Sequence, residues 1–386
     1  LCNVMKILLL DTNVSSFPIY AELKKHTNEV YVCGNNETDF LANIAGKNYI
    51  KLDYSDSDIL INHIQEKDYY AIVPGCNDIS YLSCAKIKNN NPNVLIDDIE
   101  KADILFNKEN FRCYSLSRKL PVPQIYDFEN IADAKGKILV KPVDAYSGRG
   151  ISVIENKGEL ENAVMNARNY SLSKKCLVEE YIVGNLYSHT AFISGGKIIH
   201  DFVVAEYGSA NEFVVDTSYV DFSFEKNILK EIRECIEFIV NDLKLQDGLL
   251  HTQFICNDDK FWLIELTRRC PGDLYSRLIQ LSSGFQYAKM YIDGFLGNLR
   301  KSINENGKNY ILRHTISTDR EQDFYSINCQ VPVCMIDYIS LAKSGERIKK
   351  SPFGRVGVMF LKCANERDMY ETKDLIMQRK LYSLSV

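Results

Sequence analysis

A single carboxylate stands near the end of an apolar run, and two arginines follow it closely. Residues 261–264 read Phe-Trp-Leu-Ile and predict a buried strand that continues through Glu265, Thr267, Arg268 and Arg269. Burying an ion is costly unless the ion is paired, so Glu265 needs a partner. Because side chains alternate between the faces of a strand, Glu265, Thr267 and Arg269 share one face.

The preceding strand carries His251 and Gln253 on one of its own faces. The turn between the two strands decides whether these faces coincide. A three-residue loop at 258–260 would place Gln253 opposite Glu265, whereas a two-residue loop at 258–259 would place them on opposite faces. We expect the odd loop, or a bulge with the same effect.

If the faces coincide, three oxygen-bearing side chains converge. The oxygen atoms of Gln253, Glu265 and Thr267 suit a hard cation such as magnesium, which also takes phosphate and water as ligands. Arginines behind them would be fixed donors for phosphoryl or carboxylate oxygens. The alternative is a core hairpin in which Glu265 forms an ordinary surface salt bridge with an arginine.

Two lysines and a glycine-rich loop lie upstream of the hairpin. Lys141 stands inside an apolar strand, where a lone ammonium group is costly without an anion, and Lys108 could supply a second cation. The backbone N–H groups of Gly148, Arg149 and Gly150 could approach a phosphate closely, although a plain hairpin turn has the same pattern. The motif GxxxxGK[ST] is absent, so a P-loop enzyme is not supported.

Paired carboxylates, Glu179 and Glu180, end the apolar strand at residues 176–182. Such a segment can offer adenine a backbone donor, a backbone acceptor and a carboxylate. The alternative is a strand end with solvated charges.

Composition limits the class of protein. The chain has 386 residues, 46% of them hydrophobic, which is enough for two or three packed domains. A net charge of −5 without a basic tract disfavours nucleic-acid and membrane-surface binding. The 12 cysteines are scattered, and neither a secretory signal nor a membrane-spanning run is found, so we expect a reduced, cytoplasmic chain.

Strand and helix patterns alternate in the first quarter of the chain. Strands are predicted at 5–10, 29–34 and 69–75, with helices at 19–26 and 57–66. This alternation predicts a doubly wound parallel sheet over residues 5–98. The first strand-to-helix turn lacks GxGxxG, which disfavours a dinucleotide site there.

Antiparallel patterns dominate the rest. Hairpins are predicted around Gly195 and Gly196 and at 248–267, and a last α+β segment from 311 to 386. Apolar residues at helical spacing predict an amphipathic helix over 228–243. Asp273 is predicted to cap a helix that ends at Gly284.

The order of these segments resembles the ATP-grasp superfamily of carboxylate–amine ligases. The matching segments are 107–111, 138–154, 177–188 and 248–273. The resemblance implies an α/β and α+β fold in which a Rossmann-like pre-ATP-grasp domain precedes a two-lobed ATP-grasp unit. The expected divisions are that domain at 5–98, a small lobe with a glycine-rich flap at 99–175, a large lobe with the metal site at 176–310 and a C-terminal α+β cap at 311–386.

The resemblance also implies an ATP site. Basic residues would contact the phosphates, the loop at 147–150 would be the mobile flap above them, and residues 179–182 would form the hinge that reads adenine. The expected set is Lys108, Lys141, Ser147, Gly148, Arg149, Gly150, Glu179, Glu180, Tyr181, Ile182 and Tyr187.

By the same resemblance, Arg269 corresponds to the arginine that steadies the phosphoryl group and acts in catalysis with Lys141. Gln253 and Glu265 correspond to the magnesium ligands, with manganese as an alternative metal. Glutamine at the first position is what carbamoyl phosphate synthetases carry. The third ligand is usually asparagine, and here it is Thr267.

A second departure concerns the ribose. The family usually has a glutamate two or three residues past the hinge glycine, where this chain has Leu186 and Tyr187. Ribose binding must therefore come from elsewhere.

The function that the resemblance implies is an ATP-dependent ligase. A substrate carboxylate would take the γ-phosphoryl group, and an amine would displace phosphate from the acyl phosphate to leave an amide, as amino-acid ligases do. Carboxy phosphate chemistry, as in carbamoyl phosphate synthetases or biotin carboxylases, is one alternative. A nucleotide-binding regulatory protein without catalysis is another.

The expected partners are small-molecule carboxylates and amines, with no nucleic acid or membrane, and a homodimer follows from the resemblance. Four residues are candidates for the substrate side, each with an ordinary core or surface role as its alternative. They are Arg268, His251, Arg313 and His314.

Overall fold

The computed structural model describes residues 5–91, 94–127, 130–131, 134–145, 148–258, 260–299 and 307–385. Its N-terminal part is a four-stranded parallel sheet in the order β3-β2-β1-β4. Both β1 and β4 are apolar and buried along their whole length, as strands covered on two faces must be. The strands are β1 (Ile7–Leu10), β2 (Val30–Gly34), β3 (Tyr49–Lys51) and β4 (Ala71–Pro74).

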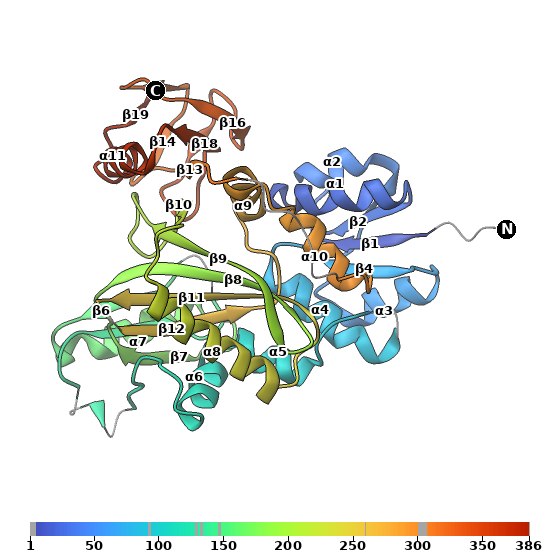
Figure 1. The fold of residues 1–386 in the computed structure, drawn as a ribbon, viewed down its shortest axis with the longest axis horizontal. Coiled ribbons are helices and arrows are strands. Elements are labelled where there is room, and N and C mark those ends of the chain that lie inside the picture. The colour runs from blue at the N-terminus through green and yellow to red at the C-terminus, as the bar shows by residue number, and fades with distance from the viewer. Residues whose placement is uncertain are drawn as a thin grey trace.

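Helices cover both faces of this sheet, which confirms the predicted doubly wound arrangement (Figure 1). On one side lie α1 (Phe17–His26) and α2 (Phe40–Ala45), and on the other α3 (Ser57–Gln65) and α4 (Asp78–Ile87). The strand order reverses between β1 and β4. The loops at the carboxyl ends of these two strands therefore border the crevice where ligands bind in open α/β sheets.

A small antiparallel sheet follows, in the order β6-β5-β7. Its apolar residues pack against α7 in a core of their own. The helices α5 and α6 lead into it from the N-terminal part. The elements are α5 (Ile99–Phe106), α6 (Lys108–Ser117), β5 (Ile138–Pro142), β6 (Ser152–Ile154), α7 (Leu160–Tyr170) and β7 (Cys176–Glu180).

The largest element is an eight-stranded sheet in the order β12-β11-β8-β9-β10-β13-β18-β16. Neighbouring strands in this sheet run antiparallel throughout. Strands from beyond residue 310 extend this sheet, so the C-terminal segment continues the large lobe. The strands are β8 (Asn185–Ser194), β9 (Lys197–Tyr207), β10 (Thr217–Val220), β11 (Gly248–Asn257), β12 (Lys260–Thr267), β13 (Tyr310–Ile316), β16 (Met335–Ser340) and β18 (Gly357–Cys363).

The two faces of this sheet differ in what covers them. The amphipathic helix α8 (Lys226–Asp242) buries Ile232, Ile236 and Ile239 against one face, close to its predicted bounds. On the other side, α9 (Tyr275–Ser283) and α10 (Tyr287–Phe295) share a continuous core with the N-terminal sheet. The N-terminal part is thus packed firmly onto the large lobe.

The start of α9 differs from the sequence-based expectation. Its N-cap is Leu274, in the left-handed region at φ +59°, and no side chain caps it. Asp273 instead accepts a hydrogen bond from Arg355 at 2.7 Å. The predicted end is correct, because Gly284 closes the helix at φ +77°.

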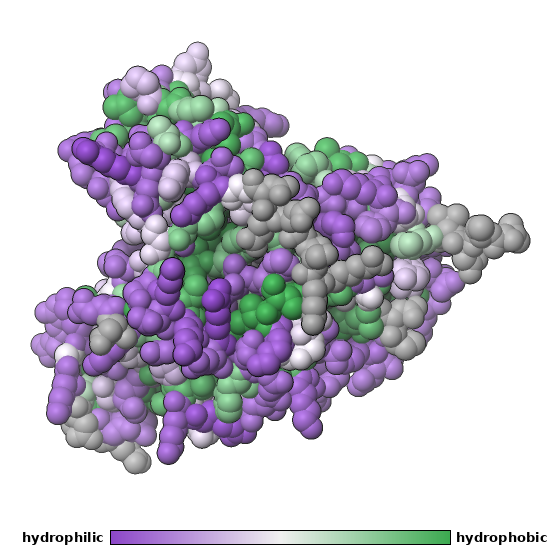
Figure 2. Space-filling model, viewed as in Figure 1, coloured by the Kyte–Doolittle hydropathy of each residue, from purple (hydrophilic) through white to green (hydrophobic). Residues whose placement is uncertain are grey.

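The C-terminal segment adds two short ladders and one helix beside the large sheet. They are β14 (Gln322–Asp323) with β17 (Arg347–Ile348), β15 (Ser326–Cys329) with β19 (Tyr382–Ser385), and α11 (Glu366–Met377). In the space-filling view the outline is hollowed between this segment and the lobe below it (Figure 2). Within the described ranges, no helix has the length and apolar character that a membrane span requires.

Candidate active site

The hairpin of β11 and β12 places Gln253 opposite Glu265. Only two residues separate the paired Asn257 and Lys260, a connection that would normally put the two side chains on opposite faces. A bulge corrects this, because Gln253 pairs with Glu265 and Phe254 with Leu263, which leaves Ile264 as an extra residue. The prediction of a bulge with the effect of an odd loop is therefore confirmed.

Glu265 is a half-exposed carboxylate with cations around it. Lys108 Nζ lies 3.5 Å from Glu265 Oε2. Burial raises the pKa of Glu265, but the charges of Lys108, Lys141 and Arg269 outweigh burial, and the pKa falls below its usual value. Glu265 is therefore ionised at neutral pH and able to bind a cation.

The amide of Gln253 is held by a residue that sequence reasoning missed. Gln253 Nε2 donates to Glu206 Oε2 at 2.6 Å, which leaves the amide oxygen of Gln253 as the atom available to a cation. Glu206 on β9 is buried, and burial raises its pKa. Across the site, Thr267 Oγ1 accepts from the backbone N–H of Arg269 at 3.4 Å. Amide, carboxylate and hydroxyl oxygens are a donor set that fits magnesium.

A buried ion cluster stands at the other side of the site. Lys141 pairs with Glu179, and both side chains are almost fully buried. Arg112, which sequence reasoning also missed, donates to the second oxygen of Glu179 at 2.9 Å. Burial is the main cause that lowers the pKa of Lys141 to about 8. The available signal was the position of Arg112 one turn after Lys108 on an amphipathic helix.

The glycine-rich loop is described from Gly148 onward, and Ser147 lies outside the described residues. Gly148 has φ +66°, and a Cβ atom there would come 2.6 Å from the carbonyl oxygen of Phe213. The guanidinium of Arg149 lies 5.1 Å from the ring centre of Phe353 in the C-terminal segment. The loop therefore contacts both the large lobe and that segment.

Backbone groups at the expected adenine hinge are partly engaged. The N–H of Glu180 donates to Gln124 O at 2.8 Å, and that of Tyr181 donates to Lys137 O at 3.1 Å. Ile182 is buried next to them. The hinge is thus anchored to the small lobe ahead of Ile182.

The structure does not bring Tyr187 to the site. Its ring stacks on Phe254 at 5.6 Å and meets Phe224 edge-on, within the apolar layer under α8. Tyr187 is paired with Phe254, one position along from the pair of Ser188 and Gln253, and neighbouring positions face opposite ways. Nothing in this placement supports a contact with a ribose.

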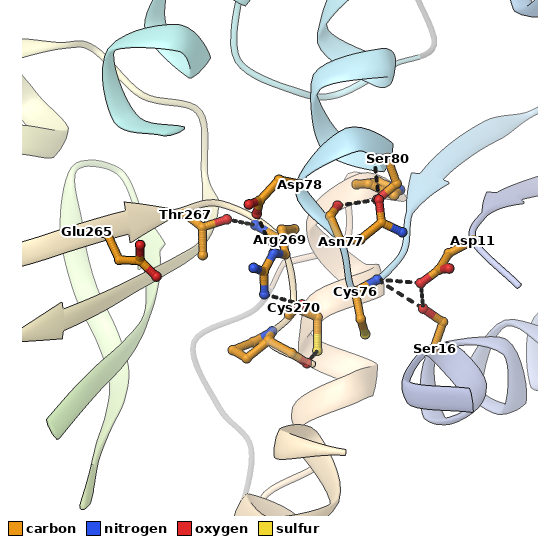
Figure 3. Close-up of polar contacts among 12 residues, drawn as sticks. Asp11, Ser16, Cys76, Asn77, Asp78, Ser80, Glu265, Thr267, Arg269 and Cys270 are labelled. Atoms are coloured by element: carbon orange, nitrogen blue, oxygen red, sulfur yellow. Dashed lines mark hydrogen bonds and ion pairs between the residues drawn. The ribbon is translucent and has the colours of Figure 1, made fainter. Parts of the chain in front are cut away.

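The two neighbouring arginines have different partners. Arg269 Nε lies 2.7 Å from Asp78 Oδ1, in the first turn of α4, and Arg269 lies just beyond the end of β12, which carries Glu265 and Thr267 (Figure 3). Arg268 points the other way and is buried, with its Nε 2.7 Å from Asp97 Oδ2. Arg268 also donates to the carbonyl oxygens of Leu249 and Gln246. These contacts give Arg268 a structural role that joins the N-terminal part to the large lobe, in place of the expected substrate contact.

The remaining substrate candidates divide in the same way. His251 is buried edge-on against Tyr275, and burial followed by the charge of Arg269 lowers its pKa to about 3, so it is neutral. Arg313 donates to Ser218 and to the carbonyl oxygen of Asp273, and its charge lowers the pKa of Glu206 against the larger effect of burial. His251 and Arg313 thus stand beside the site.

His314 stands apart from it. It is fully buried between Thr217 and Tyr382, at 2.8 and 2.7 Å, and points away from Arg313 because neighbours on a strand alternate. Burial lowers its pKa to about 4, so it is neutral as well. This packing explains His314 as a core histidine, and the expected substrate role is not supported.

Comparison with known proteins gives a consistent result. Residues 134–276 match the family described as "ATP-grasp domain". The D-alanine–D-alanine ligase of Buchnera aphidicola subsp. Schizaphis graminum is 22% identical over 47% of this chain and 57% of its own length. The chain thus spans about half the length of the curated relatives it matches.

Among solved structures, the L-amino acid ligase of Bacillus licheniformis superposes with a TM-score of 0.80 at 16% identity, covering 99% of both chains. The biotin carboxylase domain of the Hydrogenobacter thermophilus 2-oxoglutarate carboxylase, solved with MgADP, ADP and bicarbonate, superposes with a TM-score of 0.74 at 13% identity, covering 99% of this chain and 91% of that one. The predicted fold class is therefore confirmed over 99% of the chain, and residues 134–276 match the ATP-grasp domain family.

Proposed function

We propose that this protein is an ATP-dependent ligase that activates a carboxylate as an acyl phosphate and joins it to an amine, with release of ADP and phosphate. One observation carries the proposal. The bulge at Ile264 brings Gln253 and Glu265 to one face, within reach of the cations Lys108, Lys141 and Arg269. Oxygen ligands next to a row of cations are what a magnesium triphosphate requires.

Gln253, Glu265 and Thr267 would hold the magnesium ion. When bound, the ion supplies neutralisation of the negative charge on the phosphate oxygens of ATP. Lys108 and Lys141 would bind the triphosphate, and Arg269 would hold the transferring group in line with the attacking carboxylate. Each is a fixed charge that needs no rearrangement during the reaction.

The reaction that these residues would support needs no covalent bond to the protein. The carboxylate oxygen attacks the γ-phosphorus, the bond to the β-phosphate oxygen breaks, and ADP leaves. The amine then attacks the acyl carbon, phosphate leaves, and the amine loses a proton. The loop at 148–150 would exclude water, which otherwise hydrolyses the acyl phosphate.

Glu206 and Arg313 support an amino acid as a substrate. Both are buried beside the metal ligands, and they carry opposite charge types within electrostatic range of each other. A buried carboxyl group and a buried guanidinium complement the ammonium and carboxylate groups of an amino acid. The fold shared with an L-amino acid ligase is consistent with this choice.

One observation favours a second function. Gln253 stands where many relatives are expected to carry glutamate, and the biotin carboxylase that shares the fold was solved with bicarbonate. Formation of carboxy phosphate from bicarbonate is therefore the second candidate.

The test is magnesium-dependent release of ADP across a matrix of carboxylates and amines. The ligase requires both an acid and an amine, whereas bicarbonate alone would suffice for the second candidate. Binding of ATP without any release would indicate a nucleotide-binding protein without catalysis and would contradict both. The control is Glu265→Gln, which should abolish release while circular dichroism stays unchanged.

A further inference from the structure

Arg112 is the largest fully buried side chain among the described residues, and it connects two parts of the candidate site. It lies on α6, one turn after Lys108, and reaches toward β7 and β12. A guanidinium presents its N–H groups in a rigid planar fork, so acceptors on two sides fix its orientation. The identity of those acceptors shows what Arg112 holds.

On one side the acceptor is Glu179. Arg112 Nε and Nη2 lie 2.9 and 2.8 Å from Glu179 Oε2, while Lys141 takes the other oxygen. Burial raises the pKa of Glu179, but the charges of Lys141 and Arg112 lower it further and keep the carboxylate ionised. Arg112 therefore sets the position of the carboxylate that orients Lys141.

On the other side the acceptors are two consecutive carbonyl groups of β12. Arg112 Nη1 donates to Leu263 O at 3.1 Å and Nη2 to Ile264 O at 3.3 Å. In a regular strand, consecutive carbonyl groups point toward opposite edges. Both can reach one guanidinium here because Ile264 is the extra residue of the bulge.

The same bulge decides where Glu265 points. Without it, a one-residue slip would turn Glu265 away from Gln253. β12 is an edge strand of its sheet, so these carbonyl groups have no neighbouring strand to pair with on that side. Arg112 therefore satisfies backbone groups that the bulge exposes, at the point where the metal ligands are brought together.

We propose that Arg112 is a positioning residue that ties the carboxylate beside Lys141 to the bulge in β12, and so couples nucleotide binding to magnesium binding. This inference rests on the proposed function, because it assigns magnesium to Gln253 and Glu265. Lys108 on the same helix adds to the coupling, since its Nζ contacts Glu265 and donates to Ala145 O at 2.9 Å. One face of α6 thus contacts Glu265, the carboxylate of Glu179 that pairs with Lys141, and the segment leading to the glycine-rich loop.

The experiment measures ATP binding at increasing magnesium concentration for the full chain and three variants. Arg112→Met removes the guanidinium. Arg112→Lys keeps the positive charge but cannot contact Glu179 and the carbonyl groups of β12 at the same time in the same way. The matched control is Arg118→Met, which removes a half-exposed guanidinium just after the same helix, paired with Asp242 at 3.1 Å. Thermal unfolding establishes that each variant is folded.

We expect the magnesium concentration at half-maximal ATP binding to rise about 10–100-fold in both Arg112 variants, as for other partners that orient metal ligands. Arg118→Met should match the unchanged protein. A general loss of packing would weaken ATP binding without a specific shift in magnesium dependence. If Arg112→Met does not fold, Arg112→Lys carries the same test.

The outcomes separate the two claims. If the unchanged protein binds ATP with magnesium and the folded Arg112 variants keep its magnesium dependence, the positioning role is wrong and the proposed function stands. If the unchanged protein shows no magnesium-dependent ATP binding, the proposed function fails and the coupling fails with it. A crystal structure of an Arg112 variant that kept the Ile264 bulge unaltered would also overturn the positioning role.

Discussion

The guanidinium of Arg269 lies against the carboxylate of Asp78, with Nε and Oδ1 2.7 Å apart, although the two residues are 191 positions apart in the chain (Figure 3). Asp78 begins α4, the helix that follows β4, and β4 lies where the strand order of the N-terminal sheet reverses. The N-terminal part thereby supplies a charge to the candidate site at the hairpin of β11 and β12. Asp78 engages Nε of Arg269, and Nη1 of Arg269 donates to the carbonyl oxygen of Cys270 at 3.4 Å.

This contact predicts the effect of Asp78→Asn. Without the carboxylate, the guanidinium of Arg269 loses its fixed orientation, and turnover should fall by up to about 100-fold, as for a misplaced reacting group. The KM for ATP should change little, because Lys108 and Lys141 remain. The measurement is steady-state ADP release. Asp58→Asn is the control, since Asp58 is also acidic in the first turn of a helix but lies on the exposed side of α3. Equal losses in both variants would contradict the prediction.

Gln253→Glu should lower the stability of the protein through repulsion with Glu206, and bound magnesium should reduce that repulsion. The change replaces the N–H that donates to Glu206 with a second carboxylate at hydrogen-bond distance. Like charges this close repel, and Glu206 is buried, so we expect a loss of about 1–3 kcal/mol in the free energy of unfolding at neutral pH. Added magnesium should restore part of it.

The comparison for this change is Gln253→Met, which removes the same hydrogen bond without adding charge. Its stability should not respond to magnesium. Urea denaturation with and without the ion gives the answer. If magnesium did not change the free energy of unfolding of Gln253→Glu, the metal would not bind at Gln253.

Lys141 predicts an alkaline limit to activity. Its pKa is lowered from 10.5 to about 8, so the ammonium that would bind phosphate is present below pH 8 and is lost above it. The groups that face it are Glu179, which favours the charged form, and Arg112 and Lys108, which oppose it. We expect kcat/KM for ATP, which reports the free protein, to fall as pH rises through 8.

The same shift in the pKa of Lys141 has the opposite effect on stability, which increases with pH where activity falls. The unfolded chain binds the Lys141 proton more tightly than the folded one, so this residue makes stability rise between about pH 8 and pH 10.5. Lys141→Arg keeps its charge throughout and should lose the alkaline fall in activity. A pH profile that is the same for Lys141→Arg and the unchanged protein would refute the assignment.

The buried pair of Arg268 and Asp97 should matter for stability. Arg268→Met leaves Asp97 buried without its cation, and breaking such a pair costs about 3–5 kcal/mol. The control is Arg277→Met, which breaks a partly exposed pair with Asp337 and should cost no more than about 1 kcal/mol. Thermal and urea unfolding distinguish the two. Similar losses would show that Arg268 does not join the N-terminal part to the large lobe.

Gly148→Ala tests the glycine-rich loop. Both Gly148 and Gly195 have positive φ, but only a Cβ at Gly148 would strike the backbone of another segment, the carbonyl oxygen of Phe213. Each change should cost about 1–2 kcal/mol for the left-handed backbone. Gly148→Ala alone should also weaken ATP binding, measured by calorimetry, because the loop must move. If Gly148→Ala bound ATP as the unchanged protein does, the loop would not take part in ATP binding.

Most elements followed from short stretches of sequence. The apolar runs predicted β1, β4 and the strands of both hairpins, and the spacing of Ile232, Ile236 and Ile239 predicted α8. Gly284 marked the end of α9. These signals are reliable because periodicity and turn chemistry act between residues that are near in the chain. The order of such segments was also sufficient to indicate the ATP-grasp fold.

The register of the hairpin that carries Gln253 and Glu265 could not be derived in this way. The connection between Asn257 and Lys260 alone predicts that Gln253 and Glu265 face apart. They face together because of the bulge, and its carbonyl groups are satisfied by Arg112, 152 positions from Ile264. No local pattern contains that contact.

The partners of the neighbouring Arg268 and Arg269 could not be predicted from the sequence either. Residue types alone indicated that Glu265 and Lys141 would need partners, because an unpaired buried charge is costly. They did not indicate that Arg268 would meet Asp97 while Arg269 meets Asp78, or that Asp273 would pair with Arg355 instead of capping α9. The need for a counter-charge is a property of the side chain, whereas its identity depends on which distant elements the folded chain brings together.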